Sequence, residues 1–462
     1  MQVDKIAMKI RKIKYKNHPI LGNLELNLVN RKTGLPYDTI VFAGENGSGK
    51  TSVLSSLSTF LNRRSIEPFE SIEYEANGKL FNVQPLDNGL HANIGYHKRI
   101  NITDGNSINV MVAANNNEEQ INRDLDDIRH YGCVFSKARA NYSNRPIKGS
   151  TAIELDKSSY DDDNNEDFTP LKQLIIDVEI QDNRELKSAV KTAPPRSFDY
   201  QPFETSSRMY RFQQAFDTFF EKIEYSGVDP INGNLEVFFE KHNRKVSIDQ
   251  LSTGEKQIVY RGIYLLRNVG RLDGAAIMID EPELSMHPKW QKRILHYFKD
   301  LFKNADGSQK AQLFFATHSE YVLGEALKDT AKTLVVVLKD NNGTIEKKEV
   351  TAPLLLQTLV ASEVNYVAFD VCTVDYHIAL YGAIQSKYNK HSIASCDQFI
   401  ETQCAPYFMA EHRCVTTYGG NTYNTLPTKI RNHIDHPDNP YTFTEEELKT
   451  SIILMRNILD NI

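Results

Sequence analysis

The sequence predicts an α/β protein built around a parallel sheet, followed by a mostly helical C-terminal domain. Ala275–Ile279 and Gln312–Ala316 are short apolar runs without alternation, which is typical of parallel strands covered on both faces. A third apolar run, Thr39–Ala43, leads directly into a glycine-rich loop, and a helical segment follows that loop. The order of strand, glycine-rich loop and helix therefore predicts the α/β class.

Length and composition are those of an ordinary globular protein. The chain has 462 residues, enough for two or three domains, with 40% hydrophobic and 25% charged residues. A formal net charge of -6 gives no whole-chain attraction to nucleic acid or to an acidic membrane, so nucleic-acid contact would need a local basic patch. No apolar run reaches bilayer length, and the first residues lack the apolar core of a secretory signal. The odd number of cysteines, five, argues for reduced thiols. We therefore expect a cytoplasmic protein without a membrane partner.

The N-terminal region is expected to hold strands and one helix. Apolar residues alternate with lysine and arginine over Ile6–Tyr15, and the phase slips between Arg11 and Lys12, which predicts an edge strand with a bulge. A solvated strand face with protective lysines explains the basic residues better than a phosphate-backbone contact does. Further strands are expected at Leu24–Leu28 and Thr39–Ala43, and the helix at Thr51–Leu61.

The first domain is predicted to span residues 1–350, with a polar and partly helical insertion at about 101–230. The acidic run Ser158–Asp167 has no means of packing a core, so we expect a mobile surface loop there. No heptad pattern lasts long enough for a coiled-coil arm. The other elements expected in this domain are a buried strand at Gly132–Ser136, helices at Thr169–Val190 and Ser206–Phe220, and strands at Leu235–Glu240, Lys245–Ile248, Thr333–Leu338 and Thr344–Val350.

The second predicted domain spans residues 351–462 and is mostly helical. One or two helices are expected over Ser362–Tyr388. Thr444–Glu447 has the pattern of a capping box and precedes apolar residues at helical spacing, which predicts a C-terminal helix.

The glycine-rich loop, Gly44-x-x-x-x-Gly49-Lys50-Thr51, has the spacing and the strand–loop–helix context of a phosphate-binding loop. Glycines leave backbone N–H groups free to surround phosphates, and the following helix presents its positive end. Lys50 would neutralise the outer phosphates, and the hydroxyl of Thr51 would ligate magnesium. The alternative, a glycine-rich turn that binds nothing, explains fewer of these features. The expected nucleotide-binding residues are Glu45, Asn46, Gly47, Ser48, Gly49, Lys50, Thr51 and Ser52.

Polar residues end two of the predicted parallel strands, at the edge of the sheet where ligands of such folds gather. Asp280 is suited to hold magnesium through its water shell, and Glu281 to orient and deprotonate an attacking water. His318, after the next strand, is suited to sense the terminal phosphate or support the water. A polar strand end and a structural histidine are the alternatives, and the phosphate loop makes both of them weaker.

A fourth segment, Ser252-Thr253-Gly254-Glu255, lies between the phosphate loop and Asp280. Taken in this order, the four parts resemble the ABC-type P-loop ATPase superfamily over about Ile6–Leu338. The resemblance implies that the fold is an ABC-type ATPase domain with ATP and Mg²⁺ as its ligands. It also implies that these four residues are a signature that covers the nucleotide of a second copy in a head-to-tail dimer or higher oligomer.

One part of the superfamily pattern is missing. A glutamine usually lies between the phosphate loop and the signature, and the segment Phe135–Asn141 occupies that region without offering one. The residues that contact adenine are not identified by the sequence either.

The tail and the signature region together resemble the ATPase subunit of the Septu antiphage system. The similar stretches are Leu251–Gly262, Glu363–Tyr366, Tyr376–His377, Leu380–Tyr381 and Thr428–Pro437. Transporters would need membrane domains, chromosome-maintenance relatives need a long coiled coil, and overcoming-lysogeny nucleases append an acidic metal site, none of which is evident. The resemblance implies a partner HNH nuclease subunit, with nucleic acid reached through the complex.

Two other interpretations stay open. Arg431 and His436 resemble the Arg-x4-6-His motif of HEPN ribonucleases, although Arg431 bonded to a carboxylate and His436 at a helix end explain the same residues without catalysis. Alternatively, the protein binds ATP without useful turnover and acts as a sensor or scaffold.

Overall fold

The computed structural model describes residues 8–113, 118–138, 169–192, 199–200, 207–266, 274–304, 306–351, 354–404 and 406–461. The chain divides into two compact units, Met1–Glu349 and Val350–Ile462. The acidic run Ser158–Asp167, for which a surface loop is expected, lies outside the described residues.

The central sheet of the first unit has the strand order β15-β14-β3-β13-β12-β8. The pairs β14–β3, β3–β13, β13–β12 and β12–β8 are parallel, which confirms the prediction from the apolar runs. Every residue of β3, β8, β12 and β13 is buried, as the lack of alternation indicates. The strands are β3 (Thr39–Ala43), β8 (Cys133–Ser136), β12 (Ala276–Asp280), β13 (Gln312–Thr317), β14 (Thr333–Asn341) and β15 (Thr344–Val350).

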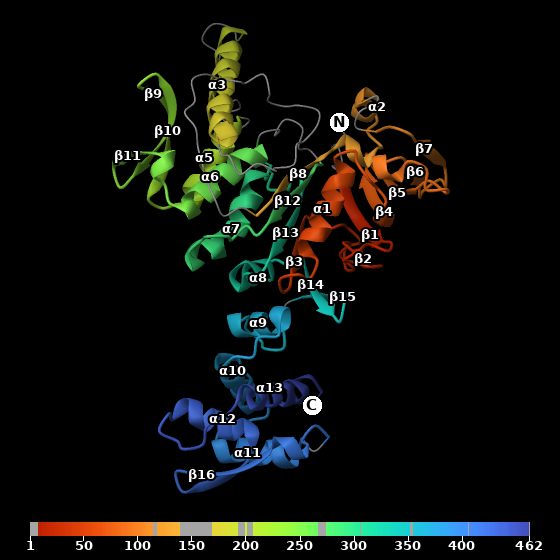
Figure 1. Cartoon of the computed structure of the whole chain (residues 1–462). Helices are drawn as coiled ribbons and strands as arrows, with labels where there is room; N and C mark the ends of the chain where they lie inside the picture. The colour runs from red at the N-terminus through yellow and green to blue at the C-terminus, as the bar shows by residue number, and fades with distance from the viewer. Residues whose placement is uncertain are drawn as a thin grey trace. The chain divides into compact units, whose positions relative to one another are not determined.

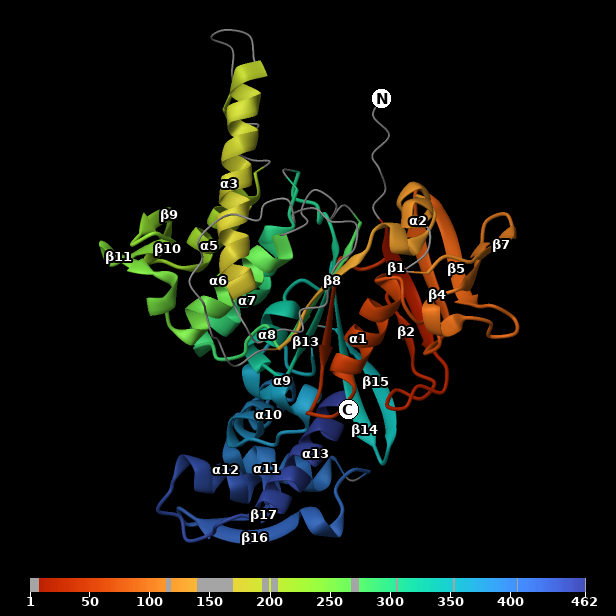
Figure 2. The same cartoon turned by 45° about the horizontal axis from the view of Figure 1, so that its top comes forward.

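Helices cover both faces of the central sheet. Helix α1 (Lys50–Leu61) lies on one face, and α7 (Pro288–Leu301) and α8 (Glu320–Ala326) lie on the other (Figures 1 and 2). Helix α6 (Thr253–Leu266) contacts β8 and α7. The carboxyl ends of β3, β12 and β13 therefore open towards the amino end of α1.

A second, antiparallel sheet packs on the other side of α1, with the order β2-β1-β4-β5-β6-β7. The bulge predicted near Arg11 is confirmed, because the register of β1 shifts between Ile10 and Lys12. The prediction of an edge position is wrong: β1 lies between β2 and β4, and its basic side chains pair with carboxylates of those neighbours. The strands are β1 (Lys9–Tyr15), β2 (Glu25–Asn27), β4 (Phe69–Ala76), β5 (Lys79–Pro85), β6 (His97–Asn101) and β7 (Ser107–Val110).

The other described elements of the first unit include three helices and a small antiparallel sheet with the order β11-β10-β9. Helices α3 and α5 agree with the helical periodicity of the sequence, whereas α2 and β9 are not predicted from it. The elements are α2 (Glu118–Arg123), α3 (Thr169–Thr192), α5 (Arg208–Phe219), β9 (Ile223–Ile231), β10 (Asn234–Lys241) and β11 (Arg244–Ser247).

The second unit is mostly helical and has its own apolar core. Thr444 and Glu447 form the predicted capping box: each backbone N–H donates to the side chain of the other residue, at 2.9 and 3.2 Å. The β16–β17 hairpin is not predicted from the sequence. The elements are α9 (Ala361–Phe369), α10 (Val374–Lys387), α11 (Ile393–Thr402), β16 (Arg413–Tyr418), β17 (Asn421–Thr425), α12 (Leu426–Asp435) and α13 (Glu445–Asn461).

Within the described part of the chain, no single helix is long and apolar enough to cross a membrane. Only α9 and α10 together reach that length and apolarity, and they are bent by 110° relative to each other. The five cysteines all lie within the described residues, and no disulfide joins any two of them.

Candidate functional site

The loop between β3 and α1 has the shape that anion binding requires. Gly44 has a φ of 142°, and a Cβ there would lie 2.1 Å from the carbonyl oxygen of Leu338, so no larger residue fits. Gly49 caps α1 with a φ of 88° and offers no side chain to the first helical N–H groups. The buried hydroxyl of Ser48 has no partner among the described residues. The loop therefore leaves the Ser48 hydroxyl and the N–H groups at the start of α1 available for phosphate oxygens.

Lys50 folds back over this loop. Its Nζ donates to the carbonyl oxygens of Gly44 and Glu45, both at 2.8 Å, and the residue is only 6% exposed. Burial lowers the pKa of Lys50, and the nearby carboxylates, Asp280 foremost, act in the opposite direction. The ammonium is thus held at the loop by weak neutral acceptors, which phosphate oxygens can replace with stronger charged ones.

The hydroxyl of Thr51 joins the phosphate loop to the end of β12. Its Oγ1 donates to Oδ2 of Asp280 at 2.9 Å. Oδ1 of Asp280 is buried and has no partner among the described residues, and burial raises the pKa of this carboxyl. A hydroxyl and a carboxylate are hard oxygen donors of the kind that Mg²⁺ takes in nucleotide sites. The two residues named for magnesium from the sequence therefore lie together and fit that ion.

Three further side chains meet where β12 and β13 end. Glu281 has a φ of 45°, which turns the chain sharply after Asp280, and its N–H donates to the carbonyl of Ala316 at 2.9 Å. Nδ1 of His318 lies 3.7 Å from Glu281 and 3.6 Å from Glu283. The structure therefore brings Glu281 and His318 to the same edge as the phosphate loop.

Glu283 is a member of this group that the sequence interpretation does not name as a site residue. It is 3% exposed and accepts hydrogen bonds from Thr317 Oγ1 at 2.6 Å and from the N–H of His318 at 3.0 Å. Its position two residues after Glu281 is the only sequence signal for it. We infer that Glu283 positions His318.

Arg261, on α6, is a second residue that the sequence interpretation misses. Its guanidinium is 5% exposed and donates to the carbonyls of Asp280, Glu281 and Lys137 at 2.9, 3.2 and 3.2 Å. A single charge inside the apolar stretch Ile258–Leu265 is the signal that could have indicated a buried role. Arg261 thus links α6 to the ends of β12 and β8.

The signature segment forms the start of α6. The N–H of Ser252 donates to Oε2 of Glu255 at 2.7 Å, the N–H of Glu255 donates back to Ser252 Oγ at 3.4 Å, and Lys241 lies 2.7 Å from Oε1 of Glu255. Ser252 and Thr253 are exposed, whereas Gly254 and Glu255 are buried. Within the described residues, no hydrogen bond or ion pair joins this segment to the phosphate loop. Its exposed hydroxyls are therefore available to another molecule.

A buried lysine ties the long helix α3 to the chain that precedes the signature. Lys172 is 3% exposed, and its Nζ lies 2.7 Å from Glu236 and 3.0 Å from Asp249. The carbonyl of Asp249 in turn accepts from Lys256 of α6 at 2.8 Å. The buried ammonium of Lys172 and the more exposed Asp249 thereby join the insertion to α6.

In the second unit, Arg431 and His436 have ordinary structural partners. Arg431 lies 2.5 Å from Asp435 one turn along α12. His436 caps the end of that helix and stacks on Tyr418, with ring centroids 4.9 Å apart. These contacts match the alternative in which the pair ends a helix.

Comparisons with known proteins add to this geometry. Residues 40–324 match the family model described as "AAA domain, putative AbiEii toxin, Type IV TA system". The retron Ec83 probable ATPase of Escherichia coli is 37% identical over 97 residues, which are 19% of this chain and 17% of the relative. The retron Vc95 probable ATPase of Vibrio cholerae serotype O1 biovar El Tor is 22% identical over 369 residues, 64% of this chain and 69% of the relative.

Among solved structures, two similar chains are SMC head domains. The SMC head bound to the C-terminal winged-helix domain of ScpA has a TM-score of 0.40 and 14% identity, over 74% of this chain and 98% of that one. The SMC head domain from Thermotoga maritima has a TM-score of 0.35 and 14% identity, over 74% of this chain and all of that one.

Proposed function

This chain belongs to the AAA-domain family of the putative AbiEii toxin of type IV toxin–antitoxin systems, and on that basis we propose that it is the ATP-hydrolysing subunit of an antiphage defence complex. The observation that carries the proposal is the 2.9 Å hydrogen bond between Thr51 and Asp280, which joins the phosphate loop to an acidic strand end. The relatives named as probable ATPases of retrons support the same activity.

The residues divide the chemistry between them. Lys50 and the loop amides hold the terminal phosphates, and Glu281 accepts a proton from the attacking water. His318, positioned by Glu283, supports that water or senses the terminal phosphate. Mg²⁺, when bound through Thr51 and Asp280, neutralises phosphate charge.

A complete site needs a second copy. The hydroxyls of Ser252 and Thr253 are exposed, and they make no bond to the phosphate loop within the described residues. We propose that they cover the nucleotide of a partner copy in a head-to-tail dimer, so that ATP binding assembles the protein and hydrolysis releases it.

Two variants test the activity. Glu281→Gln should retain ATP binding, lower kcat by about 10²- to 10⁴-fold, and accumulate as an ATP-bound dimer, because only proton acceptance is lost. Lys50→Ala should lose ATP uptake. The matched control is Glu240→Gln, an exposed carboxamide change on β10. Calorimetry measures binding, phosphate release measures turnover, and light scattering measures mass. Hydrolysis by Glu281→Gln at the wild-type rate would remove Glu281 from the mechanism.

The output of the cycle is proposed to be control of an HNH nuclease subunit, as in the Septu-like arrangement that the sequence suggests, with nucleic acid bound through the complex. Co-purification with the product of the neighbouring reading frame tests this, with Lys50→Ala as the ATP-free comparison. Two further results would favour the other interpretations. RNA cleavage by the isolated chain that is lost in both Arg431→Ala and His436→Ala would establish a ribonuclease. Full phage protection by Glu281→Gln would establish a sensor that needs binding alone.

A further inference from the structure

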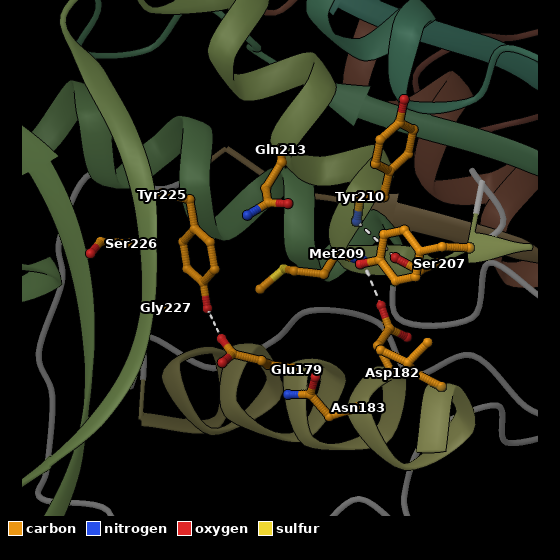
Figure 3. Close-up of a pocket in the computed structure, with 12 residues that line it drawn as sticks. Glu179, Asp182, Asn183, Ser207, Met209, Tyr210, Gln213, Tyr225, Ser226 and Gly227 are labelled. Atoms are coloured by element: carbon orange, nitrogen blue, oxygen red, sulfur yellow. Dashed lines mark hydrogen bonds between the residues drawn. The ribbon is translucent and has the colours of Figure 1, made fainter. Parts of the chain in front are cut away.

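The insertion of the first unit contains a cavity of about 270 Å³ between α3, α5 and β9. Glu179 and Asp182 line it from α3, Met209 and Gln213 from α5, and Tyr225 from β9 (Figure 3). These side chains come from three elements and point towards a common space, so the cavity is a product of the tertiary fold. None of the residues that the proposed ATP reaction uses lines it.

Among the residues that the structure describes, no cation balances the negative charge that Glu179 brings into this cavity. The hydroxyl of Tyr225 and the backbone of Val228 hydrogen bond to its carboxylate. Glu179 forms no ion pair with any residue that the structure describes, and burial raises the pKa of its carboxyl. A partly buried carboxylate served only by neutral donors gains more from a cationic partner than an exposed one does.

Asp182 adds a second carboxylate, and its own contacts anchor it. Oδ2 accepts the N–H of Met209 at 2.8 Å, and Oδ1 lies 3.5 Å from Arg208, which does not line the cavity. The described residues that line the cavity include no lysine, arginine or histidine. The cavity is therefore acidic, and an anionic ligand is disfavoured.

The aromatic wall is held rigidly. Tyr225 packs edge-on against Phe212 at 5.9 Å and Phe239 at 5.6 Å between ring centroids, and its hydroxyl is fixed on Glu179. The ring of Tyr225 and the thioether of Met209 offer polarisable surface beside the carboxylates (Figure 3). Such a combination of aromatic face and carboxylate suits an organic cation with a short alkyl stem.

We propose that this cavity binds an alkyl guanidinium or alkyl ammonium group, with Glu179 as its charge partner. No group of three metal-ligating side chains is found in the part of the chain that the structure describes, so an organic cation fits the site better than a metal ion does. The cation has two sources, a free small amine or the basic side chain of a partner polypeptide.

Calorimetry on the full chain, without nucleotide, tests the proposal. Agmatine and cadaverine represent free amines, and the capped tripeptide acetyl-Gly-Arg-Gly-amide represents a side chain carried on a polypeptide. We expect at least one of the three to bind, and Glu179→Gln to weaken that binding at least 10-fold, because the carboxamide keeps an acceptor for Tyr225 and loses only the charge. Glu224→Gln, the same change at an exposed neighbour of Tyr225 outside the cavity lining, should leave binding unchanged.

Gln213→Lys provides a second, independent variant. It places an ammonium beside Glu179, so it should abolish ligand binding while the protein unfolds at the same or a higher temperature. Binding of the amines alone identifies a small-molecule site, and binding of the tripeptide alone identifies a polypeptide partner. The proposal is overturned if none of the three probes binds at millimolar concentration, or if Glu179→Gln and Gln213→Lys bind as tightly as the wild type does.

Discussion

Replacing Arg261 by methionine tests whether the signature helix is physically joined to the acidic strand end. The substitution retains the length of the side chain and removes every donor. The carbonyls of Asp280, Glu281 and Lys137 then lose a charged partner in a site that is 5% exposed. Leaving one buried acceptor unsatisfied costs about 1–3 kcal/mol. At the lower end of that range for each carbonyl, the first unit should lose about 3 kcal/mol of unfolding free energy.

The single tryptophan, Trp290, makes the measurement specific. It lies on α7 in the first unit and packs on Phe220 at 5.2 Å between centroids, so its fluorescence in a urea titration reports this unit. The control is Arg293→Met, on the same helix as Trp290. The Arg293 side chain is 39% exposed, and we expect a loss below about 1 kcal/mol.

Arg261→Met should also lower ATP turnover at least 10-fold, because the carbonyl of Glu281 loses the guanidinium that fixes it. Arg261→Lys retains the charge but not the planar guanidinium, so its turnover and its unfolding free energy should lie between those of Arg261→Met and the wild type. An unfolding free energy of Arg261→Met within 0.5 kcal/mol of the wild type, together with unchanged turnover, would show that this link does not hold the site.

Three other substitutions probe separate features. Gly254→Ala places a Cβ about 2.9 Å from the carbonyl of Ser285, so we expect turnover to fall more than 10-fold in a phosphate-release assay while calorimetry shows unchanged ATP binding by the monomer. Burial lowers the pKa of His97 to about 4 from 6.5, so its neutral form stabilises the fold above pH 6.5, and on the order of 3 kcal/mol is lost as the pH falls to 4. Urea titrations between pH 6.5 and pH 4 should show a smaller loss of unfolding free energy in His97→Gln than in the wild type. An equal loss in both proteins would contradict the assignment to His97. Thr51→Val removes the hydroxyl that contacts Asp280, and the Mg²⁺ concentration for half-maximal turnover should rise at least 10-fold, with Thr51→Ser near the wild type.

The inner strands of the central sheet could be predicted from the sequence because they are buried on both faces. Strands Ala276–Asp280 and Gln312–Thr317 contain the continuous apolar stretches Ala276–Ile279 and Leu313–Ala316, which few other structures produce. The strands Phe69–Ala76 and Lys79–Pro85 are half exposed, and their mixed composition hides them among loops. Strand β1 illustrates a limit of local patterns: its lysines predict a protected edge, but Lys12 pairs with Glu25 of β2. The strand that holds Glu25 is predicted from the sequence, whereas its pairing with β1 is not.

The candidate site likewise contains residues that the sequence identifies and residues that only the structure identifies. Lys50, Thr51 and Asp280 belong to motifs in which the residue type and the spacing already indicate the chemistry. Arg261 and Glu283 act through contacts made by folding, with backbone carbonyls and with the N–H of His318, and such contacts leave no spacing to read. The inner strands of the central sheet and the motif residues are therefore accessible from sequence, whereas Arg261 and Glu283, which position the site, leave only weak sequence signals.

Helix α3 is 24 residues long, about 36 Å. Lys172, in its first turn, anchors it through the ion pair with Asp249. Because α3 is anchored close to one end, a small tilt at Lys172 displaces the other end of the helix by a larger distance. A displacement of that other end likewise tilts the helix at Lys172. A force applied to the far end of α3 would reach Asp249, three residues before Ser252, through the ion pair that Asp249 makes with the buried ammonium of Lys172. Binding of another molecule at the far end of α3 would in this way act on Ser252, and so on the proposed closure of a second copy over the nucleotide.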